Sequence, residues 1–207
     1  GGQLSYAANV VLKNTPIDVI VIGEGENTIV SLCEYLDGEM ELGDIRGIAY
    51  REKNGELIFT EQVHQVKNID DLSIPNYELI NMDSYLLAPE KRYGSIMAQK
   101  DSRFSEEHRK GKKSFTIMTG RGCQAKCTFC CRGVRGLRKH SPDFILDNME
   151  ILIKKYNVGF FTFGDESFVS SKEWVLEFIE KYKERNMDVL FYILGARVDI
   201  VDRELIF

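Results

Sequence analysis

Three cysteines close together carry the clearest chemical signal in this sequence. Cys123, Cys127 and Cys130 stand at the spacing Cys-x3-Cys-x2-Cys. They follow an apolar run, residues 115–118, that is typical of a strand. A short loop of thiolates at the end of a strand can wrap an iron–sulfur cube, with one thiolate bound to each iron. Three thiolates leave the fourth iron without a protein ligand, so the pattern predicts a 4Fe-4S cluster that is open to a substrate or cofactor.

A structural zinc site is the main alternative for the same thiols. Zinc sites usually combine two short Cys/His clusters into four ligands. The histidines of this sequence, His64, His108 and His140, do not form a second cluster. Ligand count and spacing therefore favour iron and sulfide. Cys131 is a fourth thiol beside the group, but adjacent residues rarely reach one metal well, so we expect it to pack as a small apolar side chain.

The cysteine spacing, with Phe129 just before the last cysteine, resembles the signature of the radical S-adenosylmethionine (SAM) enzymes. This resemblance implies that the open iron chelates SAM and that an electron from the cluster cleaves SAM to a 5′-deoxyadenosyl radical. It also implies a partial (β/α)6 barrel whose second strand ends in a turn that binds the cofactor's amino group. The residues then predicted to bind SAM are the Phe129 backbone, Gly164, Asp165, Glu166 and Arg197, the last as a donor to the carboxylate.

A structural interpretation competes with cofactor binding at each of these positions. Gly164, Asp165 and Glu166 fit an acidic turn that faces solvent, and the central Asp departs from the Gly-Gly-Glu pattern of the family. Arg197 fits an ordinary surface ion pair, and the ring of Phe129 is expected to pack against its neighbours. The sequence singles out no catalytic acid, base or nucleophile.

Strands and helices are expected to alternate after the cysteine loop. The expected strands are three apolar runs, at residues 115–118, 158–163 and 189–194. Ser141 is the expected N-cap of the first helix, with Pro at the first helical position, and Ser170 with Glu173 is the expected capping box of the second. This order predicts parallel strands with right-handed crossovers, and functional residues at the C-terminal ends of those strands. Apolar repeats predict the buried stripes of the two helices at Ile145, Met149, Leu152 and Tyr156, and at Val175, Phe178, Ile179 and Tyr182.

The first third of the chain has a different pattern. Residues 17–22 are almost wholly apolar, which is typical of a strand buried on both faces of a parallel sheet. A helical repeat follows, with Cys33 on its expected buried face, and then a hairpin with its turn at Asn54-Gly55. Together with Gly1 and Gly2, this order resembles the C-terminal part of the cobalamin-binding domain that precedes many radical enzymes. The resemblance implies that Gly1 and Gly2 lie near the nucleotide tail of cobalamin in the full-length parent.

The predicted fold class is α/β, in three segments. Residues 1–68 form the C-terminal part of a doubly wound, Rossmann-like, cobalamin-binding-type domain, and residues 69–113 form a linker or connector. Residues 114–207 form the N-terminal part of a truncated radical SAM barrel. The sequence begins at Gly1 rather than Met and ends within an amphipathic pattern, so we expect a piece of a longer protein.

Composition sets further limits on location and partners. Its 43% hydrophobic and 29% charged residues are typical of a globular domain, and no run is long enough to span a membrane. The clustered cysteines do not resemble a disulfide framework, so we expect a cytoplasmic protein. The net charge of −5 argues against nucleic acid as a partner. Ten Lys and Arg residues, with no Asp or Glu, nevertheless lie between Glu107 and Asp143; they suit an anionic cofactor or a solvated face.

The sequence thus predicts a radical SAM enzyme that acts on a small molecule, by cobalamin-dependent methyl transfer or by a radical rearrangement. A reductant such as flavodoxin or ferredoxin would supply the electron. Two other functions stay open: a radical methylthiotransferase that modifies RNA, and a non-enzymatic interaction module stabilised by zinc.

Overall fold

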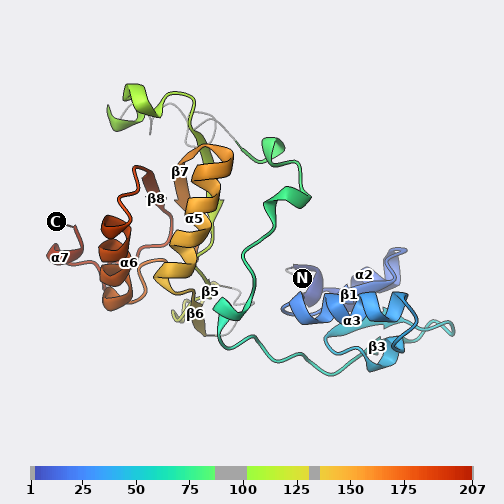
Figure 1. Cartoon of the computed structure of the whole chain (residues 1–207). Coiled ribbons are helices and arrows are strands. Elements are labelled where there is room, and N and C mark those ends of the chain that lie inside the picture. The colour runs from blue at the N-terminus through green and yellow to red at the C-terminus, as the bar shows by residue number, and fades with distance from the viewer. Residues whose placement is uncertain (1–2, 87–101, 131–135, 207) are drawn as a thin grey trace. The chain divides into compact units, whose positions relative to one another are not determined.

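The computed structural model describes residues 3–86, 102–130 and 136–206 of the chain. The chain divides into two compact units, residues 1–67 and 68–207, and each is built from both helices and strands (Figure 1). The predicted mixed α/β character is therefore confirmed. Across the described ranges, no helix is long and apolar enough to cross a lipid bilayer.

The first unit contains a three-stranded antiparallel sheet. Its strands pair in the order β1 (Val19–Val21), β2 (Ile48–Arg51) and β3 (Leu57–Phe59). Its helices are α1 (Gln3–Tyr6), α2 (Ala8–Asn14) and α3 (Glu26–Leu36). The hairpin predicted around Asn54-Gly55 is confirmed, and Gly55 takes the positive φ of 87° that its turn requires.

Two predictions about this unit are wrong. β1 is antiparallel to β2 instead of lying in a parallel sheet, and Ile20 is buried while Val19 and Val21 are half-buried. Cys33 is exposed, because α3 turns Thr28 inward, where its hydroxyl donates to the Arg46 carbonyl at 3.2 Å. An apolar repeat defines which residues share a helix face, but the contacts available to the helix decide which face is covered.

The second unit is organised around a parallel sheet in the order β4 (Lys113–Ile117), β7 (Val158–Phe163) and β8 (Leu190–Ile193). Helices α5 (Pro142–Tyr156) and α6 (Lys172–Glu184) connect these strands. A small antiparallel ribbon, β5 (Gly120–Gly122) with β6 (Leu137–Lys139), follows β4, and α7 (Arg203–Ile206) comes last. The predicted alternation of parallel strands and helices is confirmed.

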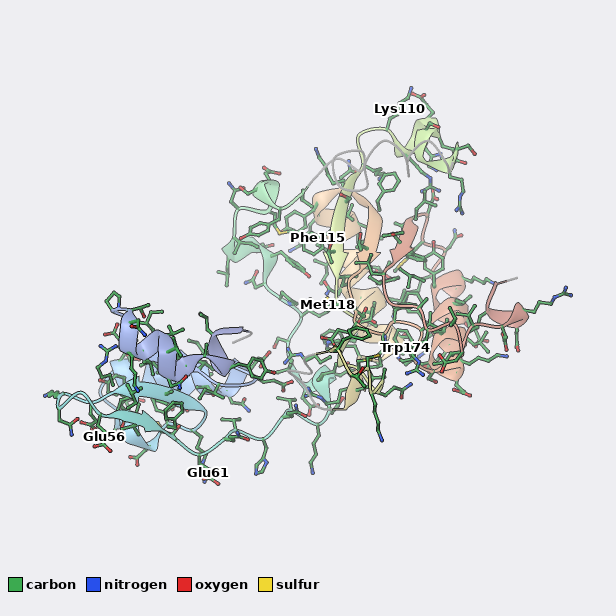
Figure 2. The ribbon with its side chains drawn as sticks, turned by 180° about the vertical axis from the view of Figure 1, so that it is seen from behind. Glu56, Glu61, Lys110, Phe115, Met118 and Trp174 are labelled. Atoms are coloured by element: carbon green, nitrogen blue, oxygen red, sulfur yellow. The ribbon has the colours of Figure 1, made fainter. Side chains whose placement is uncertain are left out.

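Both crossover helices cover the same face of this sheet (Figures 1 and 2). The predicted stripe of α5 is buried at Ile145, Met149 and Leu152. Val175 and Phe178 of α6 are buried in the same core, which also contains Phe161 and Phe163 of β7. Alternate strand residues point to one face, so this pattern directs Phe161 and Phe163 toward the helices.

Of the two predicted helix N-caps, one is confirmed and the other is wrong. The expected Ser141 cap is confirmed, because its hydroxyl accepts the Phe144 N–H at 3.2 Å. The expected cap at Ser170 is wrong by one residue: Ser171 accepts the Trp174 N–H at 3.3 Å and donates to Glu173 at 2.6 Å. Val169 forms a bridge with Ala196, which extends the strand-like path and delays the start of α6.

Residues 69–113 belong to the second unit rather than forming only an extended linker. The short 3-10 helices of this stretch are Ile69–Asp71, Tyr77–Leu79, Met82–Ser84, Ser102–Ser105 and Glu107–Arg109; in the first unit, Leu42–Asp44 is a further one. Tyr77 and Met82 are buried in the core beside α5. The Tyr77 hydroxyl donates to Asn148 at 3.0 Å, so this stretch is fastened to α5.

Candidate cofactor site at the strand ends

The cysteine loop, residues 123–130, follows β4 and β5 at the C-terminal end of the parallel strands. Gly122 has a φ of 80°, which lets the backbone turn into the loop. Cys123 is half-buried, whereas Cys127 and Cys130 are exposed. The Ala125 N–H donates to the Cys123 sulfur at 3.4 Å.

The donor set of this loop fits an iron–sulfur cluster. It offers three soft thiolates within eight residues, a backbone N–H directed at one sulfur, and no carboxylate within the loop. In the ranges that the structure describes, no three His, Cys, Asp or Glu side chains converge closely enough to hold a metal ion. Holding a cluster therefore requires Cys127 and Cys130 to turn toward Cys123.

The turn after β7 is only partly the acidic, solvent-facing turn that the sequence suggests. Glu166 is exposed, but Asp165 is 5% exposed, and its two oxygens accept the backbone N–H and the hydroxyl of Thr119, both at 2.9 Å. Gly164 packs closely on β4, where an added Cβ would lie 2.9 Å from the Thr116 methyl group. The turn is thus bound to the residue just after β4.

Arg197 follows β8 and is held in an ion pair. Its guanidinium pairs with both oxygens of Asp199, at 3.0 and 2.5 Å, so the surface ion pair considered from the sequence is present. Asp199 raises the pKa of Arg197, and the charges of Cys123 and Cys127 raise it further. Arg197 therefore lies within electrostatic reach of two predicted cluster ligands.

Three strand-end loops meet in this region. The Gln124 amide donates to the Ser170 carbonyl at 2.9 Å, which joins the cysteine loop to the loop after β7. An added Cβ at Gly195 would lie 2.5 Å from the Asp165 carbonyl, so the loop after β8 touches the same turn. The structure thus brings Cys123, Asp165 and the Gly195–Arg197 segment to one end of the sheet, which Figure 2 shows as the end near Met118 and Trp174.

Some predicted residues are not placed in this cluster. The Phe129 ring is 90% exposed, so the expectation that it packs against neighbours is wrong. It stands in the turn between Cys127 and Cys130, where described neighbours do not cover it. Gly1, Gly2 and Cys131 lie outside the described residues.

Sequence reasoning missed a polar network behind the site. Lys139 donates to the Thr119 hydroxyl at 2.6 Å, and burial lowers the pKa of Lys139 to about 8 although the Asp165 charge opposes this. Asp70 accepts from the Ser141 N–H at 3.1 Å and pairs with His140 at 2.8 Å. Burial also lowers the pKa of His140. The basic residues were visible in the sequence, but no local pattern paired them with partners tens of residues away.

Known proteins share this fold. No family model matches the chain. An uncharacterized methyltransferase of Pyrococcus horikoshii is 26% identical over 193 residues, which cover 91% of this chain and 37% of that protein. An anaerobic magnesium-protoporphyrin IX monomethyl ester cyclase of Rubrivivax gelatinosus is 28% identical over 200 residues, which cover 94% of this chain and 32% of that protein. The chain thus spans about a third of the length of these two relatives.

A solved structure matches both units of the chain. The cobalamin-dependent SAM radical enzyme OxsB, with aqua-cobalamin and SAM bound, aligns with a TM-score of 0.63 and 21% sequence identity. The match covers 91% of this chain and 24% of that enzyme. The resemblance to radical SAM enzymes that carry a cobalamin-binding-type domain is therefore confirmed at the level of the fold.

Proposed function

We propose that the protein containing this chain is a radical SAM enzyme whose 4Fe-4S cluster is held by Cys123, Cys127 and Cys130. The observation that carries this proposal is the Cys-x3-Cys-x2-Cys loop at the C-terminal end of β4, in a parallel sheet. The fold likeness to OxsB and the names of the two relatives support it. When bound, the cluster would supply the electron that cleaves SAM reductively to a 5′-deoxyadenosyl radical.

The chain's own residues would bind and orient the cofactor. The three thiolates would each bind one iron, and the open iron would take SAM. Arg197 would donate to the SAM carboxylate, sharing its guanidinium with Asp199. Glu166 is exposed beside this region and would accept from the SAM amino group. The Phe129 backbone would contact the adenine.

Gly164 and Asp165 would support these contacts without touching SAM. Gly164 lets the turn lie against β4, since a side chain there would meet Thr116. Asp165 has both oxygens engaged by Thr119, which suits a residue that positions the turn. We therefore assign direct contact with SAM to Glu166 and a supporting position to Gly164 and Asp165.

Methyl transfer to a small molecule, with cobalamin bound by the full-length parent near Gly1 and Gly2, is the reaction we propose. The methyltransferase relative and the cobalamin-bound neighbour favour it over a radical rearrangement. The net charge of −5 disfavours nucleic acid as substrate. A reductant such as flavodoxin or ferredoxin would deliver the electron, and a reducing cytoplasm would suit the free thiols.

Anaerobic reconstitution of the full-length parent with iron and sulfide tests the cluster. We expect a brown protein with about four irons per chain, as a single cubic cluster requires. Cys123→Ala, Cys127→Ala and Cys130→Ala should each lose it, whereas Cys33→Ala, at an exposed thiol of the first unit, and Cys131→Ala should retain it. Stoichiometric zinc without iron would refute the proposal.

Ligand binding tests the two cofactors separately. With dithionite, the reconstituted protein should convert SAM to 5′-deoxyadenosine, and Glu166→Gln and Arg197→Ala should weaken SAM binding in equilibrium dialysis. Hydroxocobalamin titration, followed by corrin absorbance, should show binding to the full-length parent. Absence of corrin binding would remove methyl transfer through cobalt while leaving the cluster assignment intact.

A further inference from the structure

We infer that Lys139 is a positioning residue that holds the cysteine loop (residues 123–130) against the loop after β7 (residues 164–170). It acts through Thr119 and the Phe168 carbonyl, and it does not itself contact the cysteines. The inference rests on the proposed function only in that the cysteine loop is the cluster site.

Thr119 is the residue through which the connection runs. It is fully buried, it follows β4, and only the three residues of β5 separate it from Cys123. Its hydroxyl donates its single proton to Asp165 at 2.9 Å, because a carboxylate can only accept. The hydroxyl must therefore accept from Lys139, which it does at 2.6 Å. Chemistry permits only one direction for this chain of hydrogen bonds, from Lys139 through Thr119 to Asp165.

The β5–β6 ribbon positions Lys139 beside Thr119. It pairs with Gly120, and its side chain passes so closely that an added Cβ at Gly120 would lie 2.7 Å from Lys139 Cδ. The ammonium group donates to the Phe168 carbonyl at 3.3 Å. It also lies 4.0 Å from the ring centre of Trp174, a cation–π contact that fills its remaining side. The ammonium thus joins β6, the Phe168 loop and the start of α6.

The charge of Lys139 also stabilises the nearby carboxylate of Asp165. Asp165 is 5% exposed, and the hydrogen bonds that its carboxylate accepts from Thr119 come from neutral donors. A buried carboxylate is stabilised by a nearby cation, and the Asp165 charge in turn opposes the effect of burial on the pKa of Lys139. Removing the lysine charge would therefore weaken the attachment of Asp165 to Thr119.

Other hydrogen bonds near Thr119 and the cysteine loop would remain after Lys139 is replaced. The His140 N–H donates to the Thr119 carbonyl at 2.9 Å, and Gln124 donates to the Ser170 carbonyl. These bonds do not involve the Lys139 side chain. Loss of that side chain should consequently loosen the start of the cysteine loop without unfolding α5 or α6.

Thiol alkylation of the cluster-free, reduced full-length parent measures this loosening without using activity. We compare Lys139→Met, which keeps the apolar stem, with Lys139→Arg, which keeps the charge. Lys154→Met is the matched control, since Lys154 is exposed and pairs with Glu150 one turn away on the same helix. Mass spectrometry follows iodoacetamide labelling of half-buried Cys123 against exposed Cys33 of the first unit. Hydrogen exchange of α5 and α6 reports whether the unit stays folded.

Lys139→Met should raise the labelling rate of Cys123 relative to Cys33 by about tenfold, as expected when one member of a connected network is lost. Lys139→Arg should return the rate toward wild type, and Lys154→Met should leave it unchanged. Thr119→Val, which removes only the hydroxyl, should have a similar effect, and the double variant should add little to either.

Two results would overturn the inference. One is an unchanged Cys123 rate in both Lys139→Met and Thr119→Val. The other is a rise at Cys123 that comes only with lost protection throughout α5 and α6, which would show a general structural role. The proposed function fails separately, if the wild-type protein takes up no iron.

Discussion

Helices α3 and α5 have similar apolar repeats, but they are buried to different extents. α5 buries Ile145, Met149 and Leu152 in the core of the second unit. α3 buries only Thr28, and it leaves Ile29 and Leu36 exposed, at 55% and 78%. The difference teaches that a helical repeat predicts a helix, while burial depends on which elements the fold brings against it.

The N-termini of the two helices also differ. α5 begins at Ser141, whose hydroxyl caps the helix, and Asp70 binds the Ser141 N–H from the connector. α3 begins after Gly25, which makes no side-chain capping bond. A capped and buried helix is fixed at several points, so changes in α5 should cost far more than matched changes in α3.

The largest effect is expected in the core. Leu152→Ala should lower the free energy of unfolding of the second unit by about 2–5 kcal/mol, because it leaves a cavity at a fully buried site. Trp174 is the single tryptophan of the chain, so its fluorescence in urea reports this unit. Leu36→Ala on α3, followed by circular dichroism, should change stability by less than about 0.5 kcal/mol. A comparable loss at Leu36 would break the contrast and show that Leu36 itself is covered in the folded protein.

A smaller effect is expected at the start of α5. Although burial by itself raises the pKa of Asp70, hydrogen bonds from Ser141 and His140 bring it below its ordinary value of 3.8. Folding thus favours the carboxylate, which contributes stability above pH 3.8 and loses that contribution as the pH falls through the lower folded value. Asp70→Asn should cost about 1–3 kcal/mol at pH 7, and progressively less in urea titrations below pH 4.

Asp71→Asn provides the matched control for this prediction. Asp71 is exposed, and its carboxylate accepts from Asn68 within the same turn. Its replacement should leave the unfolding midpoint nearly unchanged. An equal effect of the two substitutions would mean that Asp70 does not fasten the connector to α5.

The corrected start of α6 gives a third test. Ser171→Ala should cost about 1 kcal/mol, because it removes the hydroxyl that accepts the Trp174 N–H. Ser170→Ala should change stability by less than about 0.5 kcal/mol, since the buried Ser170 hydroxyl has no hydrogen-bond partner in the described parts of the chain. The reverse order would restore Ser170 as the cap.

The smallest effect is expected when α3 is given the cap that it lacks. Gly25→Ser has room for its Cβ, which would meet only a Val21 methyl group at 3.5 Å. It should stabilise the first unit by a few tenths of a kcal/mol, roughly the difference between Gly and Ser at an N-cap. Thermal unfolding followed by circular dichroism measures it, and a clear loss would show that Gly25 needs to remain without a side chain.

Local sequence determined the features that depend on near neighbours. The cysteine spacing, the turn at Asn54-Gly55, the cap at Ser141 and the apolar stripe of α5 could all be predicted. Each is decided by residues within a few positions of one another, where spacing alone sets geometry. The parallel direction of β4, β7 and β8 followed as well, because a helix that connects two strands brings the chain back so that the second strand runs in the same direction.

Tertiary structure alone decided the contacts between distant residues. The sequence did not show that Asp165 would turn inward to Thr119, that Lys139 would complete this pair, or that Arg197 would bind Asp199. It also misplaced Cys33, on a helix face that the described elements leave uncovered. A polar side chain is satisfied by whichever partner the folded backbone brings within about 3 Å, and that choice is made only when strands far apart in the chain come together.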